Sequence, residues 1–385
     1  MSATQATDYD ILIRGGRVID PAQEIDAALD VGIRDGCIAA VGPSLPAERA
    51  RQVIDAHGLL VTPGLIDLHT HVYEHVTPLS INADALAARS GTTTMVDAGS
   101  SGAATFAGLR KFVVEPSRCR ILALLNVSLI GLAAMPECGY GRFVDPTRTA
   151  QVVEANRDVI VGIKVRGSRN AFGEDNGDQP IWHARSAGIA AGVPTMLHLG
   201  DPPPTVEQAL SILGAGDVVT HCYKGQPVTR LVDHRGRAKP VLVEARERGV
   251  RLDVGHGSGS FSWEVARRLC DQGFWPDTIS TDVHHQSIVG PVYDMPTTMS
   301  KLLHLGMPLT EVVRASTINA AKAIGWDDRI GSLRVGAIAD VAVLALEEGS
   351  FALTDSYRQT ETARQRLAAR HTIRGGRLLQ VSGSF

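Results

Sequence analysis

The sequence lacks a long apolar run. Its longest, residues 121–136, is shorter than the ~20 residues that a membrane-spanning helix needs, and it is interrupted by Asn126 and Ser128. The first ten residues have neither a positive start nor an apolar core, so we expect no secretory signal. These absences argue against a membrane protein and against secretion.

Cysteine is scarce, and the charges nearly balance. The five cysteines are odd in number, scattered and without CxxC spacing, so we expect free thiols in a reducing cytoplasm rather than a disulfide framework. Lys and Arg number 38 against 41 Asp and Glu, which leaves a formal charge of −3 and no basic run. Binding to a phosphate backbone depends on such basic clusters, and nucleic acid is therefore not expected as a partner.

Apolar residues are plentiful enough for a large core. Hydrophobic residues make up 44% and charged residues 21% of the 385 positions. The length suits a (β/α)8 barrel, which takes roughly 250–300 residues, together with a smaller appendage. Two structural units are therefore expected.

Both ends of the chain are typical of short β-hairpins. Residues 10–13 form a β-like run that ends in two glycines, and residues 339–344 have the same character. The Ile-Arg-Gly-Gly of residues 13–16 recurs at residues 373–376. Runs of this kind bounded by glycine predict strands and turns. We expect residues 1–61 and 335–385 to form one small β-sandwich domain.

The middle of the chain, residues 62–334, alternates apolar β-branched runs with longer stretches of helical periodicity. This alternation predicts βα units around a parallel sheet, and eight units fit a TIM-like (β/α)8 barrel of the α/β class. The expected strands end near His69, Asp97, Asn126, Lys164, His198, His221, Val254 and Asp282. The expected helices cover residues 82–90, 180–191, 205–213, 241–248, 262–272 and 309–323.

Imidazoles and a carboxylate stand at the ends of these expected strands. His69 and His71 lie two residues apart, so strand alternation points both the same way. His198, His221 and Asp282 each follow a later strand. A single one of these residues would as readily have a structural role. In a barrel, however, the carboxyl ends of the strands meet on the active-site face, and the set together predicts a metal centre.

Lys164 ends another expected strand but has the wrong charge for a metal site. An ammonium group repels a metal ion and has no lone pair to donate. Carboxylation by carbon dioxide would convert the side chain into a carbamate, an anionic ligand that can bridge two metal ions. The alternative is a lysine whose ammonium reaches solvent from the strand end.

The pattern resembles the amidohydrolase superfamily, in its binuclear subtype with a carboxylated lysine. The resemblance covers nearly the whole chain and begins with the motif at residues 63–71. Residues 162–166, 253–257 and 280–282 are similar, more narrowly, to the dihydroorotase-like group of amidohydrolase/deacetylase metallohydrolases. Members of that group are associated with deacylation of small carboxylates.

The resemblance implies two divalent metal ions. Zinc is expected from the imidazole donors, while manganese, iron or cobalt also accept mixed nitrogen and oxygen ligands. A hydroxide between the metal ions would attack the scissile carbonyl, and Asp282 would pass its proton to the leaving atom. The implied ligands are His69, His71 and Asp282 for one ion, His198 and His221 for the other, and carboxylated Lys164 between them.

The substrate pocket departs from the dihydroorotase pattern. Dihydroorotases carry an Arg two residues after the second histidine of the first strand, where this chain has Val72-Tyr73, so a pyrimidine substrate is not expected. Other cations and polar groups are available to hold a substrate carboxylate or an oxyanion. The candidates are Arg166, Arg169, His256 and His284, with Tyr223, Lys224 and Tyr73 as weaker ones.

The leading functional hypothesis is a cytoplasmic deacylase that cleaves an amide or ester bond of a small acylated carboxylic acid. An N-acyl amino acid of D or β type, or an acyloxy acid, would be such a substrate. The alternative is a cyclic amidohydrolase that opens a hydantoin, lactam or dihydropyrimidine ring. A non-catalytic barrel scaffold is the alternative from another class. Barrels often pair through their outer helices, so we expect a homo-oligomer.

Overall fold

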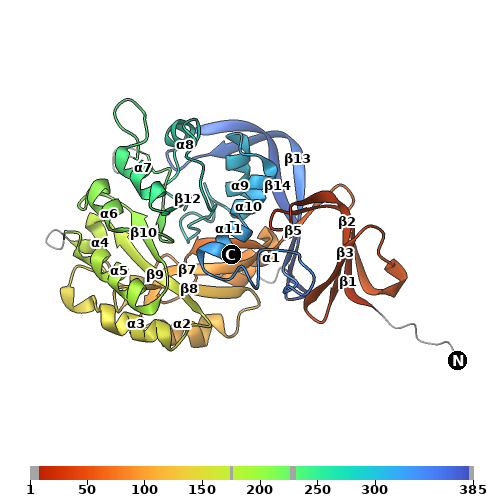
Figure 1. Cartoon of the computed structure of the whole chain (residues 1–385), viewed down its shortest axis with the longest axis horizontal. Coiled ribbons are helices and arrows are strands. Elements are labelled where there is room, and N and C mark those ends of the chain that lie inside the picture. Colours follow the sequence, from red (N-terminus) through yellow and green to blue (C-terminus); the bar gives the residue numbers. More distant parts are fainter. Residues whose placement is uncertain (1–7, 174–176, 226–230, 381–385) are drawn as a thin grey trace.

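The computed structural model describes residues 8–173, 177–225 and 231–380 (Figure 1). Two sheets organise the chain: an eight-stranded sheet from both terminal regions and a seven-stranded parallel sheet from the middle. Residues 1–7, which contribute to the expectation of no secretory signal, lie outside the described residues. In the described ranges, no helix has the length and apolarity needed to cross a bilayer.

The terminal sheet joins strands from the two ends of the chain. Its order is β15-β14-β13-β5-β1-β2-β3, with β4 paired to β1. Asp35-Gly36 and Gly375-Gly376 form the turns of two hairpins, and all four residues have positive φ, as tight two-residue turns require. Its strands are β1 (Tyr9–Asp20), β2 (Ile25–Arg34), β3 (Cys37–Gly42), β4 (Ala50–Asp55), β5 (Leu60–Pro63), β13 (Val341–Thr354), β14 (Thr360–Arg374) and β15 (Arg377–Leu378).

The parallel sheet forms the barrel. Its neighbours follow the chain from one strand to the next. An eighth segment closes the ring: Thr278 bridges to Asp253, and Val283 bridges to Thr70, both in parallel. This segment makes isolated bridges instead of a continuous strand. The strands are β6 (Leu65–Thr70), β7 (Thr92–Gly102), β8 (Arg120–Asn126), β9 (Ile160–Gly167), β10 (Thr195–Leu199), β11 (Val218–Thr220) and β12 (Arg251–Asp253).

Helices cover the outside of the barrel, and several begin at a capping side chain. Asn82, Thr205 and Ser262 each accept a backbone N–H three residues later, which is typical of an N-cap. The longer helices are α1 (Ala83–Ser90), α3 (Pro146–Glu154), α5 (Gln179–Ala191), α6 (Val206–Ile212), α7 (Pro240–Glu247), α8 (Trp263–Cys270), α9 (Met295–His304), α10 (Leu309–Ala315) and α11 (Ile318–Ala323). The short ones are α2 (Phe106–Leu109) and α4 (Arg169–Phe172), with 3-10 turns at Ala47–Arg49, Gly131–Ala133 and Gly141–Phe143 and a π-turn at Arg110–Val114.

The helix expected over residues 309–323 is wrong in one respect, because it is two helices. Thr317 leaves helical geometry, with φ −133° and ψ −95°. The carbonyl of the preceding Ser316 accepts the backbone N–H of Ile66 at 2.9 Å. That carbonyl is thus bonded to the first barrel strand, and the chain turns between α10 and α11.

The β13–β14 hairpin extends beyond the terminal sheet. Residues 341–344 of β13 pair with β5, whereas its later residues pair with β14 alone. Figure 1 shows the blue hairpin reaching from the terminal sheet towards α8. We call residues 354–360 the hairpin tip. It meets the barrel at Ser356, whose N–H donates to the carbonyl of Phe261 at 2.9 Å. The predicted unit boundaries at residues 61/62 and 334/335 stay a prediction, since this hairpin contacts both units.

Candidate metal centre

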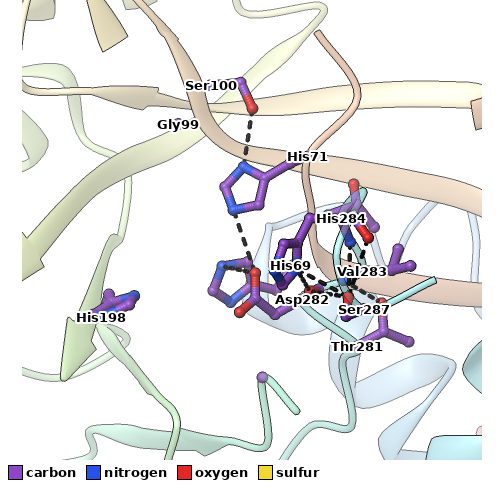
Figure 2. Close-up of polar contacts among 12 residues, drawn as sticks. His69, His71, Gly99, Ser100, His198, Thr281, Asp282, Val283, His284 and Ser287 are labelled. Carbon is purple, nitrogen blue, oxygen red and sulfur yellow. Dashed lines mark hydrogen bonds and ion pairs between the residues drawn. The ribbon is translucent and has the colours of Figure 1, made fainter. Parts of the chain in front are cut away.

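The predicted ligands from β6 and the closing segment lie together at the carboxyl end of the barrel. The Nε2 atoms of His69 and His71 are each 3.3 Å from Oδ1 of Asp282. Figure 2 shows His71 between Ser100 and Asp282, with a dashed line to each. His221 is close as well, because one potential ligand atom each from His69, His221 and Asp282 lie within 4.8 Å of one another. All three residues are suitable metal ligands.

Hydrogen bonds around the imidazoles determine which nitrogens face the site. Thr220 donates its hydroxyl to Asp253 at 2.7 Å and therefore accepts the Nδ1–H of His69 at 3.0 Å. The Nδ1–H of His221 donates to the carbonyl of Gly255 at 2.6 Å. Both bonds place the proton on Nδ1, so Nε2 has the lone pair and faces the site, as in metal-binding histidines with such outer partners.

His198 completes the histidine set from β10. Its Nδ1 is 2.8 Å from Nε2 of His221, and the ring centroids are 4.2 Å apart. Burial lowers the pKa of His221 to about 3 and that of His198 well below its usual range. Both imidazoles are therefore neutral, which is the form that donates a lone pair to a metal ion.

Lys164 reaches the same site from β9. It is 1% exposed, and its Nζ lies 3.1 Å from Nε2 of His69 and 3.3 Å from Sδ of Met196. Burial lowers its pKa to about 7. A substantial fraction is thus the neutral amine near neutral pH, and the neutral amine is the form that combines with carbon dioxide. Gly99, at φ +86°, makes room for this side chain, since a Cβ there would lie 2.7 Å from Cγ of Lys164.

Two of the clustered residues have unusual backbone geometry. His221 has φ +72° and Asp282 has φ +48°, and neither is a glycine. Residues other than glycine adopt this left-handed region at some cost in free energy, which the surrounding structure must offset. The carbonyl of His221 accepts the N–H of Lys224 at 3.0 Å, which holds the turn. Such geometry occurs preferentially at functional sites.

Arg166 and Arg169 differ in their surroundings. The guanidinium of Arg166 forms a two-pronged ion pair with Glu137 through Nε and Nη2, each at 2.7 Å. The Glu137 side chain is fully buried, so this pair joins β9 to the loop after β8. Arg169 is exposed, and its Nε donates to the carbonyl of Pro202 at 3.0 Å. The internal pair favours a structural role for Arg166 over the predicted binding of a substrate carboxylate.

The predicted substrate-binding histidines and tyrosine are divided between the site and the core. His284 lies beside the site, with ring centroids 6.5 Å from His71 and its Nδ1 2.7 Å from the carbonyl of Asp282. His256 is fully buried and contacts Lys301. Tyr223 is also fully buried, and its hydroxyl donates to the carbonyl of Phe274 at 3.0 Å. His256 and Tyr223 thus have packing roles, and substrate contacts by them stay a prediction.

Comparison with known proteins identifies the family. A model of the amidohydrolase family matches residues 60–379. The chain belongs to the amidohydrolase family. It is 39% identical over 355 residues to a deacetylase of Agrobacterium fabrum, a match that covers 90% of this chain and 86% of that protein.

Solved structures share this fold closely under different names. A crystal structure titled as a dihydroorotase has a TM-score of 0.88 and 37% identity, with 97% of this chain and 98% of that chain covered. One titled as an adenine deaminase has a TM-score of 0.90 and 30% identity, with 96% and 99% covered. The amidohydrolase described here is therefore a hydrolase of amide bonds, and the scaffold alternative is set aside.

Some contacts around the proposed ligands of this amidohydrolase were not predicted from the sequence. Asp253 accepts hydrogen bonds from Thr220, Thr278 and Ser280 at 2.6–2.7 Å. Because Thr220 in turn contacts His69, Asp253 helps to orient that imidazole. The one sequence feature that could have indicated Asp253 is its position at the end of the seventh barrel strand, β12. Nothing in the sequence singles out Ser100, whose hydroxyl lies 2.9 Å from Nδ1 of His71.

Proposed function

We propose that this amidohydrolase is a metal-dependent deacylase that cleaves the amide or ester bond of a small acylated carboxylic acid. The observation that carries the proposal is the convergence of neutral imidazoles, a carboxylate and a buried lysine at the carboxyl end of the barrel. Deacetylases 30–39% identical to this chain over most of its length support the deacylase class.

The donor set fits two divalent metal ions, with zinc preferred. His69, His71 and Asp282 would hold one ion, and His198 and His221 the other, with carboxylated Lys164 between them. When bound, the metal ions supply Lewis acidity, which activates water and polarises the scissile carbonyl. The hydrogen bonds to Thr220, Ser100 and Gly255 orient the imidazoles for this task.

Asp282 is the proposed proton carrier. Its carboxylate lies between His69 of β6 and His71, which follows that strand, and its own carbonyl accepts from the ring of His284 at 2.7 Å. From this position it can take a proton from the attacking water and deliver it to the leaving nitrogen or oxygen. His284 stays the candidate for contact with the substrate oxyanion.

Lys224 is the cation that we favour for holding the substrate carboxylate. It lies three residues after His221 and is half-buried. Among the described residues, its ammonium is in no ion pair, whereas Arg166 is bound to Glu137. Burial lowers the pKa of Lys224 because it disfavours the charged form, and a substrate carboxylate beside the ammonium would offset that cost.

The Lys224→Met variant is expected to raise KM for carboxylate substrates by about 10- to 100-fold, the value of a charged hydrogen bond of roughly 1.5–3 kcal/mol. Neutral ester analogues should change by less than about twofold, because they do not use the ammonium. Arg166→Met combined with Glu137→Gln is the control, since it removes a cation and its partner together. The assignment fails if this control, and not Lys224→Met, loses preference for the carboxylate.

The ring-opening alternative rests on a specific neighbour, the structure titled as a dihydroorotase. The same metal centre would serve either reaction, so only the pocket distinguishes them. A homo-oligomer and a cytoplasmic location also stay proposals, and sedimentation of the purified protein would test the first.

The deciding experiment combines metal analysis with a substrate panel. The panel contains N-acyl L-, D- and β-amino acids, acyloxy acids, hydantoins, dihydroorotate and, as a deamination control, adenine. We expect about two metal ions per chain and acyl release from an open-chain acid. Ring opening would establish the alternative, ammonia release from adenine would indicate a deaminase, and protein without metal would overturn the proposed centre.

A further inference from the structure

A second buried lysine lies near the proposed metal centre and is not one of its proposed ligands. Lys301, on α9, is fully buried. Its Nζ is 2.7 Å from Nε2 of His256, 2.9 Å from the carbonyl of Pro291 and 2.7 Å from the carbonyl of Thr354. The three partners come from three different segments. All three accept hydrogen bonds, so each of the three N–H donors of the Lys301 ammonium has a partner.

His256 connects Lys301 to the loop at residues 255–258. Its Nδ1–H donates to the carbonyl of Gly257 at 2.9 Å, which leaves Nε2 as the acceptor for Lys301. The ring stacks on Phe261, with centroids 4.7 Å apart and an interplanar angle of 9°. Ring orientation and tautomer are thus both determined, and the lysine sets the position of the backbone that follows.

That backbone packs directly against the proposed proton carrier. A Cβ at Gly257 would lie 2.3 Å from Oδ2 of Asp282, so the two are in close contact. The N–H of Gly257 donates to the carbonyl of Thr281 at 2.8 Å, one residue before Asp282. Ser258 then contacts Nε2 of His284 at 3.3 Å. A displacement of this loop would move the Asp282 carboxylate.

The hairpin tip secures the loop from the other side. Its Thr354 supplies one carbonyl to Lys301, and the hydroxyl of Ser356 contacts the carbonyl of Gly257 at 3.0 Å. The end of the terminal sheet's longest hairpin is therefore joined to the loop beneath the catalytic face.

We propose that Lys301, acting through His256, is a positioning residue that holds the loop at residues 255–258 against Asp282. The ammonium and the hairpin tip together restrict the loop, and the loop restricts the carboxylate. The inference rests on the proposed function to the extent that Asp282 carries the proton, while the restraint on the loop does not depend on it.

The test uses metal-loaded full-length protein and two variants with a matched control. Lys301→Met keeps the side-chain length and removes all three donors. Ser356→Ala is a milder change on the hairpin side, available if the first variant does not fold. Ser300→Ala is the control, because its hydroxyl accepts the N–H of Leu367 at 2.8 Å and joins α9 to β14 without contacting His256.

Three readouts are measured alongside the unfolding temperature of each variant. Hydrogen exchange at the amides of His256 and Gly257 should accelerate at least about tenfold in Lys301→Met, and less in Ser356→Ala. Both amides join the loop to the closing segment, at the carbonyls of Ser280 and Thr281, and a loop that is no longer held would open these bonds more often. On the best substrate of the panel, kcat should fall about 10- to 100-fold, with KM within about twofold, because the carboxylate is misplaced. The solvent deuterium isotope effect on kcat should rise as proton transfer becomes slower.

Ser300→Ala should leave exchange at both amides unchanged even if it lowers the unfolding temperature. Unchanged exchange in both Lys301→Met and Ser356→Ala would overturn the inference, and so would an equal acceleration in Ser300→Ala. If exchange accelerates in the variants but the unaltered protein hydrolyses nothing on the panel, the restraint on the loop is supported and the proposed function is refuted. The two failures are therefore distinguishable.

Discussion

The Lys164→Ala variant is expected to lose about 10³-fold or more of kcat/KM, which corresponds to roughly 4 kcal/mol of transition-state stabilisation. It should also bind fewer metal ions than the unaltered chain. The reason is that the proposed carbamate is an anionic bridge, and alanine offers neither charge nor oxygen. Metal analysis by mass spectrometry and steady-state kinetics on the same samples would measure both losses.

Chemical rescue makes this prediction specific to the carbamate. Short-chain carboxylic acids added to Lys164→Ala should restore part of the metal content and part of the rate, because they supply the missing oxygens. The exposed Lys322→Ala serves as the control and should behave as the unaltered enzyme. Full activity in Lys164→Ala without added acid would refute the binuclear proposal.

The Asp282→Asn variant is expected to lower kcat by about 10²- to 10⁴-fold, the range typical of a lost general acid–base residue. KM should change by less than about threefold, because the shape of the side chain is retained. Metal content is measured in parallel, since the same carboxylate is a proposed ligand. A variant that keeps its metal and kcat but binds substrate poorly would contradict the proton-carrier role.

The sequence predicted the barrel and the clustered residues for one physical reason. Parallel strands place their carboxyl ends on one face, so residues far apart in the chain, such as His69 and His221, come together once the strands are located. His69 and Thr220 are hydrogen-bonded although they lie 151 positions apart in the sequence. The clustering of the proposed ligands thus follows from the topology of the barrel.

The parts that could not be predicted depend on tertiary contacts. Glu137 lies in an irregular loop, and only the fold shows that it neutralises Arg166. The break at Thr317 follows from the bond between Ser316 and Ile66, which no helical periodicity reveals. The contact of the hairpin tip with Gly257 likewise joins residues 99 positions apart through a strand that the sequence assigns to another unit.

The hairpin also sets an order of events during synthesis. Every proposed metal ligand has been synthesised once residue 282 is added, whereas β13, which joins the last strands to the terminal sheet, begins only at Val341. The hairpin tip, which contacts the loop next to Asp282, is therefore translated after every proposed ligand. Because chains fold progressively from the N-terminus as they emerge, a nascent chain would have its proposed ligands before the segment that supports them.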